Sequence, residues 1–166
     1  MRLHALALLA SVAIVACGGG GEANKDTSAA TPAASTPAPA TPAPAGGAVA
    51  KIAPTGQTVT IKMLGDDKGY RFDPADVTIK SGDAVKFVMV SGGPHNVTFD
   101  PATIPADSKA QLDANMDQKA SELSSPMMMN PNEEYTISFG GIKPGKYDFH
   151  CTPHLAMGMK GSITVQ

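Results

Sequence analysis

Hydrophobic and polar residues alternate with a period of two along most of the chain after Gln57. In the first such run, Val59, Ile61 and Met63 alternate with polar residues, which predicts a β-strand that buries one face. Similar runs recur, and the early ones end in turn sequences rich in Gly, Asp and Ser. The predicted strands cover residues 58–63, 77–80, 85–89, 96–99, 134–139, 145–150 and 162–165. Short strands separated by regular turns predict an all-β antiparallel sandwich or barrel.

One stretch does not follow this alternation. Residues 106–124 are polar and rich in Ala, Asp, Lys and Gln, and we expect them to form a long excursion with a short helix. The whole chain has 166 residues, is 42% hydrophobic and carries a net charge of -2, which is typical of a soluble protein with one globular domain. Because the chain has no basic excess, we do not expect a nucleic-acid partner.

The N-terminal residues have the features of an export signal. Arg2 precedes an apolar run over residues 3–16 that is too short to span a bilayer. The run ends in Ile-Val-Ala followed by Cys17, which resembles a bacterial lipobox. We therefore expect residues 1–16 to be a lipoprotein signal peptide and Cys17 to carry a lipid anchor. The alternative is an ordinary cleaved signal with an incidental cysteine.

The next segment has the composition of a linker. Residues 17–50 consist almost entirely of Gly, Ala, Thr, Ser and Pro, and such a segment cannot bury enough apolar surface to fold. This leaves residues 51–166, about 115 residues, as a folded domain with one modest core. We expect an exported protein, in the periplasm or at the cell surface, held at a bacterial membrane through Cys17.

Near the C-terminus, Cys151, His154 and Met159 form the pattern C-x2-H-x4-M within one short loop. These ligands are soft or borderline, and together with a second imidazole they suit copper in both oxidation states. If Cys17 carries lipid, Cys151 has no disulfide partner, and metal ligation is the simplest use of an exported free thiol. The alternative is a buried inert thiol. We expect the second imidazole to be His95, which by itself would more often be a turn or surface residue.

Several segments resemble the cupredoxins, plastocyanin and pseudoazurin in particular. They are Pro94-His95-Asn96-Val97, Phe99-Asp100, Ile104-Pro105, Tyr147-x-Phe149-x-Cys151-Thr152-Pro153-His154 and Met157-Gly158-Met159. The resemblance covers residues 72–166 and implies an eight-stranded Greek-key sandwich with one type 1 blue copper ion. It also implies that His95, Cys151 and His154 surround the copper in one plane, with Met159 as a long axial ligand. Asn96 would form hydrogen bonds near the Cys sulfur and the first His.

Other methionines offer alternatives. Met157 is a second candidate for the axial position, but the four-residue gap after His154 favours Met159. The run Met127-Met128-Met129 could capture Cu(I). Its position before Asn130-Pro131, however, resembles an apolar plastocyanin segment that packs near the site. We therefore expect the three methionines to pack in the core.

His150 precedes Cys151 at a position where plastocyanin has an aromatic residue. In copper nitrite reductases and multicopper oxidases, a His beside the Cys binds a second, catalytic copper. Such a centre needs more histidines than remain after His95 and His154 are assigned, so we do not expect an enzyme. Strand alternation turns His150 away from Cys151, and we expect it near the surface, either beside an electron route or without a role.

The resemblance implies a monomeric carrier that cycles one copper between Cu(I) and Cu(II) and has no small-molecule substrate. Electrons would pass through the exposed edge of His154, and a small apolar patch would allow brief docking of redox proteins. The patch would consist of Pro94, Pro153, Leu155 and Met157. Two alternatives are a copper storage or delivery protein that uses the methionine-rich stretch and, less favoured, a copper-enzyme subunit that uses His150.

Overall fold

The structure is a computed structural model that describes residues 48–166. The predicted signal peptide, Cys17 and all but the last three residues of the predicted linker lie outside the described residues, so these remain predictions. Within the described part of the chain, no helix is both long enough and apolar enough to cross a membrane.

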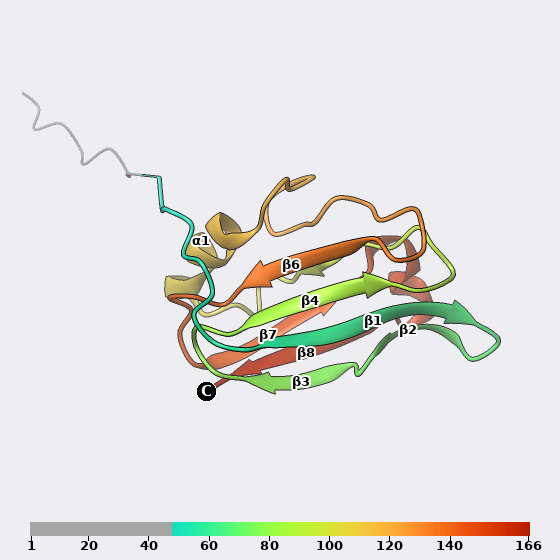
Figure 1. The fold of residues 1–166 in the computed structure, drawn as a ribbon, viewed down its shortest axis with the longest axis horizontal. Helices are drawn as coiled ribbons and strands as arrows, with labels where there is room; N and C mark the ends of the chain where they lie inside the picture. The colour runs from blue at the N-terminus through green and yellow to red at the C-terminus, as the bar shows by residue number, and fades with distance from the viewer. Residues whose placement is uncertain (1–47) are drawn as a thin grey trace, which may run out of the picture. The chain divides into compact units, whose positions relative to one another are not determined.

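Two four-stranded sheets form a sandwich (Figure 1). The strand order is β2-β1-β4-β6 in the first sheet and β3-β8-β7-β5 in the second. The strands are β1 (Thr58–Asp66), β2 (Gly69–Asp73), β3 (Asp76–Ile79), β4 (Ala84–Met89), β5 (Thr98–Phe99), β6 (Glu134–Ser138), β7 (Gly145–His150) and β8 (Lys160–Val165). The predicted β-sandwich is therefore confirmed. The alternation did not predict β2, because Tyr70 and Phe72 are the only apolar positions in that short segment.

The strands are not all antiparallel, so this part of the prediction was wrong. β1 pairs in parallel with β4, and β3 pairs in parallel with β8. The course of the chain after β2 explains the first case. Only Pro74 and Ala75 separate β2 from β3, so the chain keeps its direction while it moves from the first sheet to the second. The turn at residues 81–83 then reverses the chain, and β4 enters the first sheet in the direction of β1.

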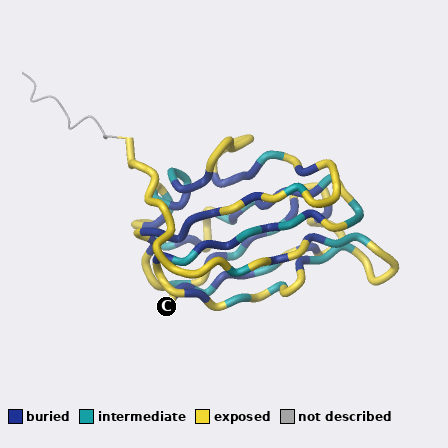
Figure 2. Tube along the Cα trace, viewed as in Figure 1, coloured by how far each residue is buried: buried dark blue, intermediate teal, exposed yellow. Residues whose placement is uncertain are grey.

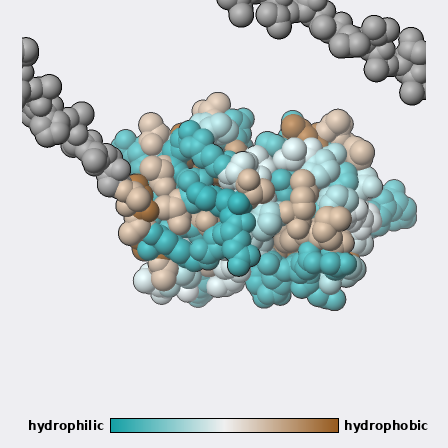
Figure 3. All heavy atoms as spheres, turned by 90° about the horizontal axis from the view of Figure 1, so that it is seen from above, coloured by the Kyte–Doolittle hydropathy of each residue, from teal (hydrophilic) through white to brown (hydrophobic). Residues whose placement is uncertain are grey.

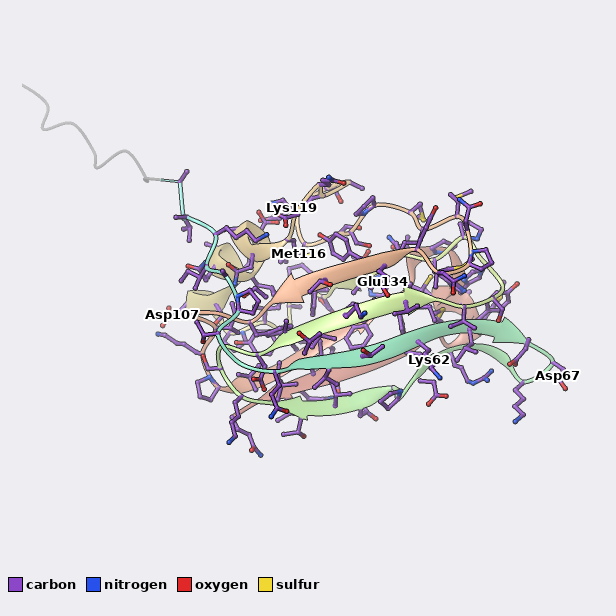
Figure 4. The ribbon with its side chains drawn as sticks, viewed as in Figure 1. Lys62, Asp67, Asp107, Met116, Lys119 and Glu134 are labelled. Atoms are coloured by element: carbon purple, nitrogen blue, oxygen red, sulfur yellow. The ribbon has the colours of Figure 1, made fainter. Side chains whose placement is uncertain are left out.

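Buried residues alternate with more exposed ones along the strands (Figure 2). One set of side chains therefore points into the space between the sheets. Aromatic rings meet edge to face in this core, and the ring centroid of Phe149 lies 4.8 Å from that of Phe72 and 5.4 Å from that of Phe87. The outer face of the first sheet is polar, and its exposed side chains include Lys62 and Glu134 (Figure 4). Each strand of this sheet therefore separates the core from solvent, as the alternation predicted.

The excursion between β5 and β6 contains the predicted short helix, α1 (Ala106–Asn115), at one end of the sandwich (Figure 1). Its last residue, Asn115, is fully buried. The Asn115 amide nitrogen donates to the carbonyls of Ser138 and Gly140, each at 2.9 Å. The Asn115 amide oxygen accepts from the backbone N–H of Ile52 at 2.9 Å. This one side chain joins the helix to the end of β6 and to the segment before β1.

We expect Asn115→Ala to lower the free energy of unfolding by about 2–3 kcal/mol, because two buried carbonyls would lose their donor. Urea denaturation followed by circular dichroism would measure this change. Lys62→Ala, at an exposed position, is the matched control and should change stability by less than about 0.5 kcal/mol. An Asn115→Ala protein as stable as the control would show that these bonds do not anchor the helix.

Candidate metal centre

The loop between β7 and β8 carries three of the predicted ligands and is closed by its own backbone. Cys151 directly follows β7, and a short 3-10 segment, η1 (Thr152–Met157), comes next, at the end of the sandwich away from α1 (Figure 1). Met159 follows η1 directly before β8. The N–H of Cys151 donates to the Met159 carbonyl at 3.1 Å, and the N–H of Met159 donates to the His154 carbonyl at 3.2 Å. Gly158 has φ 84°, a left-handed conformation that favours glycine. These features hold the loop in one backbone shape.

His95 lies outside the regular strands and is held by two separate sets of hydrogen bonds. Its backbone pairs with that of Met128 through N–H to carbonyl bonds of 3.0 Å and 2.8 Å. Its ring Nε2 lies 2.8 Å from the Ser91 carbonyl, which can only accept a hydrogen bond. The Nε2 atom is therefore the protonated one, and Nδ1 keeps its lone pair for another partner.

Three buried donor atoms converge between this segment and the loop. Cys151 Sγ lies 3.6 Å from His95 Nδ1 and 3.5 Å from His154 Nδ1, and the two Nδ1 atoms are 3.2 Å apart. His95 and Cys151 are fully buried, and His154 is 6% exposed. Among the residues that the structure describes, no other group of three or more His, Cys, Asp or Glu side chains brings its ligand atoms within 4.8 Å.

Burial sets the protonation states of these groups. It lowers the pKa of both imidazoles, and the nearby His95 ring lowers the pKa of His154 further. Both rings therefore favour the neutral form, which binds metals. Burial also raises the pKa of the Cys151 thiol, although the backbone amides of Asn96 and His154 act in the opposite direction. A Cys151 thiolate at this position needs a cation beside it.

The donor set fits copper. Two imidazole nitrogens and one thiolate in a triangle are the arrangement of blue copper centres, which add a weak axial thioether. Met159 is fully buried, and its backbone is hydrogen-bonded to both Cys151 and His154. Met157, the alternative axial residue, is largely exposed. Burial therefore favours Met159 as the fourth donor.

Asn96 links the His95 segment to the ligand loop. The Asn96 amide oxygen accepts from the backbone N–H of Thr152 at 2.8 Å. The Asn96 amide nitrogen donates to the hydroxyls of Thr152 at 3.2 Å and Ser124 at 3.3 Å. Because Asn96 is buried and fully bonded, it fixes the distance between the residue after His95 and the residue after Cys151.

One aromatic residue at the site, Tyr70 from β2, was not predicted from the sequence. The Tyr70 ring stacks on the His154 imidazole, with 3.7 Å between ring centroids and 13° between ring planes. Gly65 makes room for it, since a Cβ on Gly65 would lie 2.7 Å from a ring carbon of Tyr70. The stack covers one face of the imidazole and restricts its rotation. Alternation could not have indicated Tyr70, because its contact with His154 depends on how the two sheets pack.

The prediction that the methionine run packs in the core was wrong for two of its three residues. Met128 is 4% exposed, whereas Met127 is 44% exposed and Met129 is 60% exposed. Met128 pairs with His95 in an antiparallel bridge, and side chains next to each other in such a pairing point to opposite sides. A run of three residues in this conformation cannot bury all its side chains against one core.

Apolar side chains surround the ligand loop at the surface. Pro153, Leu155 and Met157 are exposed, and Pro94 is half-buried. Hydrophobic surface on the face displayed in Figure 3 is divided into small areas among hydrophilic ones. The four residues of the predicted docking patch therefore have the exposure that a small contact surface needs, and the patch remains a prediction.

His150 lies outside the ligand cluster. It ends β7, where it pairs with Thr98 on one side and Lys160 on the other. Its half-buried side chain lines a pocket of about 370 Å³ together with Asp100 and Leu155. Within the described residues, the geometry gives no second metal cluster that includes His150.

We expect Tyr70→Leu to lower the free energy of unfolding of the metal-free protein by about 0.5–1.5 kcal/mol more than Tyr70→Phe, because leucine keeps the apolar bulk but loses the aromatic pair. The His154 ring protons should also lose the ring-current shift that the stack imposes. Urea denaturation and proton NMR would measure the two effects. Equal stabilities and equal His154 shifts in the two variants would contradict the role given to the stack.

Comparisons with known proteins agree with this geometry. The family described as copper binding proteins, plastocyanin/azurin family, matches residues 59–166. The chloroplastic plastocyanin of Physcomitrium patens is 38% identical over 114 residues, which are 69% of this chain and 61% of that protein. This chain thus matches less than two thirds of the length of that plastocyanin. The plastocyanin of Scenedesmus fuscus is 38% identical over 109 residues, which are 65% of this chain and 99% of that protein.

A pseudoazurin structure from Methylobacterium extorquens AM1 is 29% identical, with a TM-score of 0.44, over 65% of this chain and 74% of that chain. The resemblance to the cupredoxins inferred from the ligand motifs is confirmed by the family match, which spans nearly all of the sandwich. The chain therefore belongs to the copper-binding plastocyanin/azurin family.

Proposed function

We propose that the protein is a type 1 copper electron carrier that passes single electrons between redox partners. The observation that carries this proposal is the buried convergence of Cys151 Sγ with Nδ1 of His95 and His154. Relatives named plastocyanin support the same function. We include Met159 as the axial donor because it is buried in the same loop.

Each donor type suits the role we give it. Copper bound at this position would supply a one-electron couple between Cu(I) and Cu(II). Cys151 would bind as a strongly donating thiolate, and the imidazoles of His95 and His154 would suit both oxidation states. The thioether of Met159 would be a weak donor that helps to set the reduction potential.

The protein holds these donors through contacts that do not depend on the charge of a metal. Ser91 orients the His95 ring, Tyr70 covers the His154 ring, and the loop backbone fixes Cys151. The donors therefore need to move little when an electron arrives or leaves. Small movement lowers the energetic cost of reorganisation, which favours fast transfer.

The predicted surface features complete the proposal. His154 would present its small exposed edge to a partner, and the patch of Pro94, Pro153, Leu155 and Met157 would contact it. A small apolar contact favours brief encounters, which a shuttle requires. We further propose that the carrier is a monomer, exported and tethered through a lipid on Cys17.

Two rival functions follow from specific residues. A copper-enzyme subunit would use His150, but a catalytic centre needs further histidines, and the described residues contain none beyond His95, His150 and His154. A storage or delivery protein would exchange copper readily, and the exposed thioethers of Met127 and Met129 are the observation that supports it. Neither rival accounts for the rigid, buried geometry as well as a carrier does.

We expect the copper-loaded protein to show an intense visible absorption band and to keep its copper through repeated reduction and oxidation. Cys151→Ser should abolish the band, because the band requires the copper–thiolate bond, while circular dichroism should remain that of the sandwich. Absorption spectra and copper analysis before and after cycling are the measurements. Loss of copper during cycling would favour delivery, and the absence of the band from the wild-type protein would exclude a blue centre.

We expect Met159→Leu to raise the reduction potential, because removal of the axial donor stabilises Cu(I) relative to Cu(II). A tenfold change in that equilibrium corresponds to ~59 mV for one electron, and voltammetry resolves it. Met157→Leu serves as the matched control and should leave the potential nearly unchanged. A larger shift in Met157→Leu than in Met159→Leu would assign the axial position to Met157.

A further inference from the structure

Two exposed methionines lie on either side of Met128, in the segment that pairs with the first proposed ligand, His95. Met127 and Met129 are exposed, whereas Met128 between them is buried. In an extended segment, side chains two residues apart point to the same side, and their Cα atoms lie about 6.6 Å apart. Methionine side chains are long and flexible, so two thioethers at this separation can bind one ion together.

The pairing of this segment places the backbone of both methionines next to the segment that carries His95. Backbone hydrogen bonds join Met128 to His95 in an antiparallel bridge. The register of that bridge sets Met129 opposite Pro94 and Met127 opposite Asn96. The side chain of Met128 lies on the same side of the bridge as that of His95, so the two exposed thioethers lie on the other side, toward solvent.

The Glu133 carboxylate forms hydrogen bonds at the end of this segment. Glu133 accepts hydrogen bonds from the backbone N–H of Met129 and from the side-chain amide of Asn130. The backbone that carries the pair is therefore held in place, while the thioethers remain accessible. The negative charge of Glu133 also favours a cation next to Met129.

The proposed copper centre itself is almost closed to solvent. His95 and Cys151 are fully buried, and His154 is nearly so. A copper ion that arrives bound to another molecule must therefore lose ligands of that molecule before it reaches these donors. Thioethers are soft ligands that select Cu(I), and exposed ones can begin that exchange at the surface.

We propose that Met127 and Met129 form a capture site for Cu(I), from which the ion passes to the buried centre. The inference rests on the proposed function, because that centre is the destination. The ion remains Cu(I) throughout, so no electron is transferred. The thioethers are neutral and release no proton, and Cys151 releases its thiol proton to solvent when its sulfur binds the ion.

The test compares anaerobic loading of the copper-free protein with Cu(I) supplied as its bicinchoninate complex. We expect the M127L/M129L protein to load several-fold more slowly than the wild type but to reach the same stoichiometry and, after oxidation, the same visible band. Leucine is also apolar, so the double variant keeps an apolar surface at these positions. Slower loading would therefore report the loss of the thioethers. Met157→Leu measures the contribution of a lone exposed thioether, and its effect should be smaller.

A second measurement separates coordination from an indirect effect. One further equivalent of Cu(I), added to the loaded protein, should shift the methyl NMR signals of Met127 and Met129. The signal of Met116, which is buried beside α1, should not move (Figure 4).

Equal loading rates, slow loading without methyl shifts, or slower loading in Met157→Leu than in the double variant would each overturn the inference. A wild-type protein that never becomes blue would instead refute the proposed function, and the methyl shifts would still decide the capture site.

Discussion

The candidate centre depends on hydrogen bonds that order two irregular segments. Neither His95 nor the loop that begins at Cys151 belongs to a regular strand, so the strand ladders alone do not fix them. The loop closes on itself through Met159, and the His95 segment pairs with Met128. Asn96 then joins the two segments. Ordering a backbone costs conformational entropy, and these bonds offset that cost so that the donors stay within 3.6 Å of one another.

The donors contribute little favourable energy by themselves. Two neutral imidazole nitrogens 3.2 Å apart beside a buried thiol lose their contacts with water and gain few strong bonds in return. The surrounding structure must therefore supply the stability that keeps them together. The edge-to-face cluster around Phe149 lies two residues before Cys151 on β7, and it fixes the strand from which the loop departs. The aromatic core therefore supports the ligand loop through the strand that leads into it.

Local patterns in the sequence carried most of the information about the fold and the donors. Alternation predicted the strands because each buries one face, and C-x2-H-x4-M predicted the loop ligands because they are close in sequence. Other features depend on contacts between distant segments. The parallel pairing of β1 with β4 and the stack of Tyr70 on His154 follow from sheet packing and register. No local pattern encodes them, and for this reason the prediction erred or was silent there.

The hydrogen bonds that anchor α1 and the candidate donors lie at opposite ends of the sandwich (Figure 1). At one end, α1 is anchored by Asn115, and the Tyr147 hydroxyl near the start of β7 donates to the Lys143 carbonyl at 2.7 Å. At the other end, β7 delivers Cys151 to the ligand loop. Sites this far apart with no shared partner are expected to act additively. Changes at Asn115 should therefore alter unfolding without altering the donors, whereas changes at Tyr70 or Asn96 act on both because they touch the ligand-bearing segments.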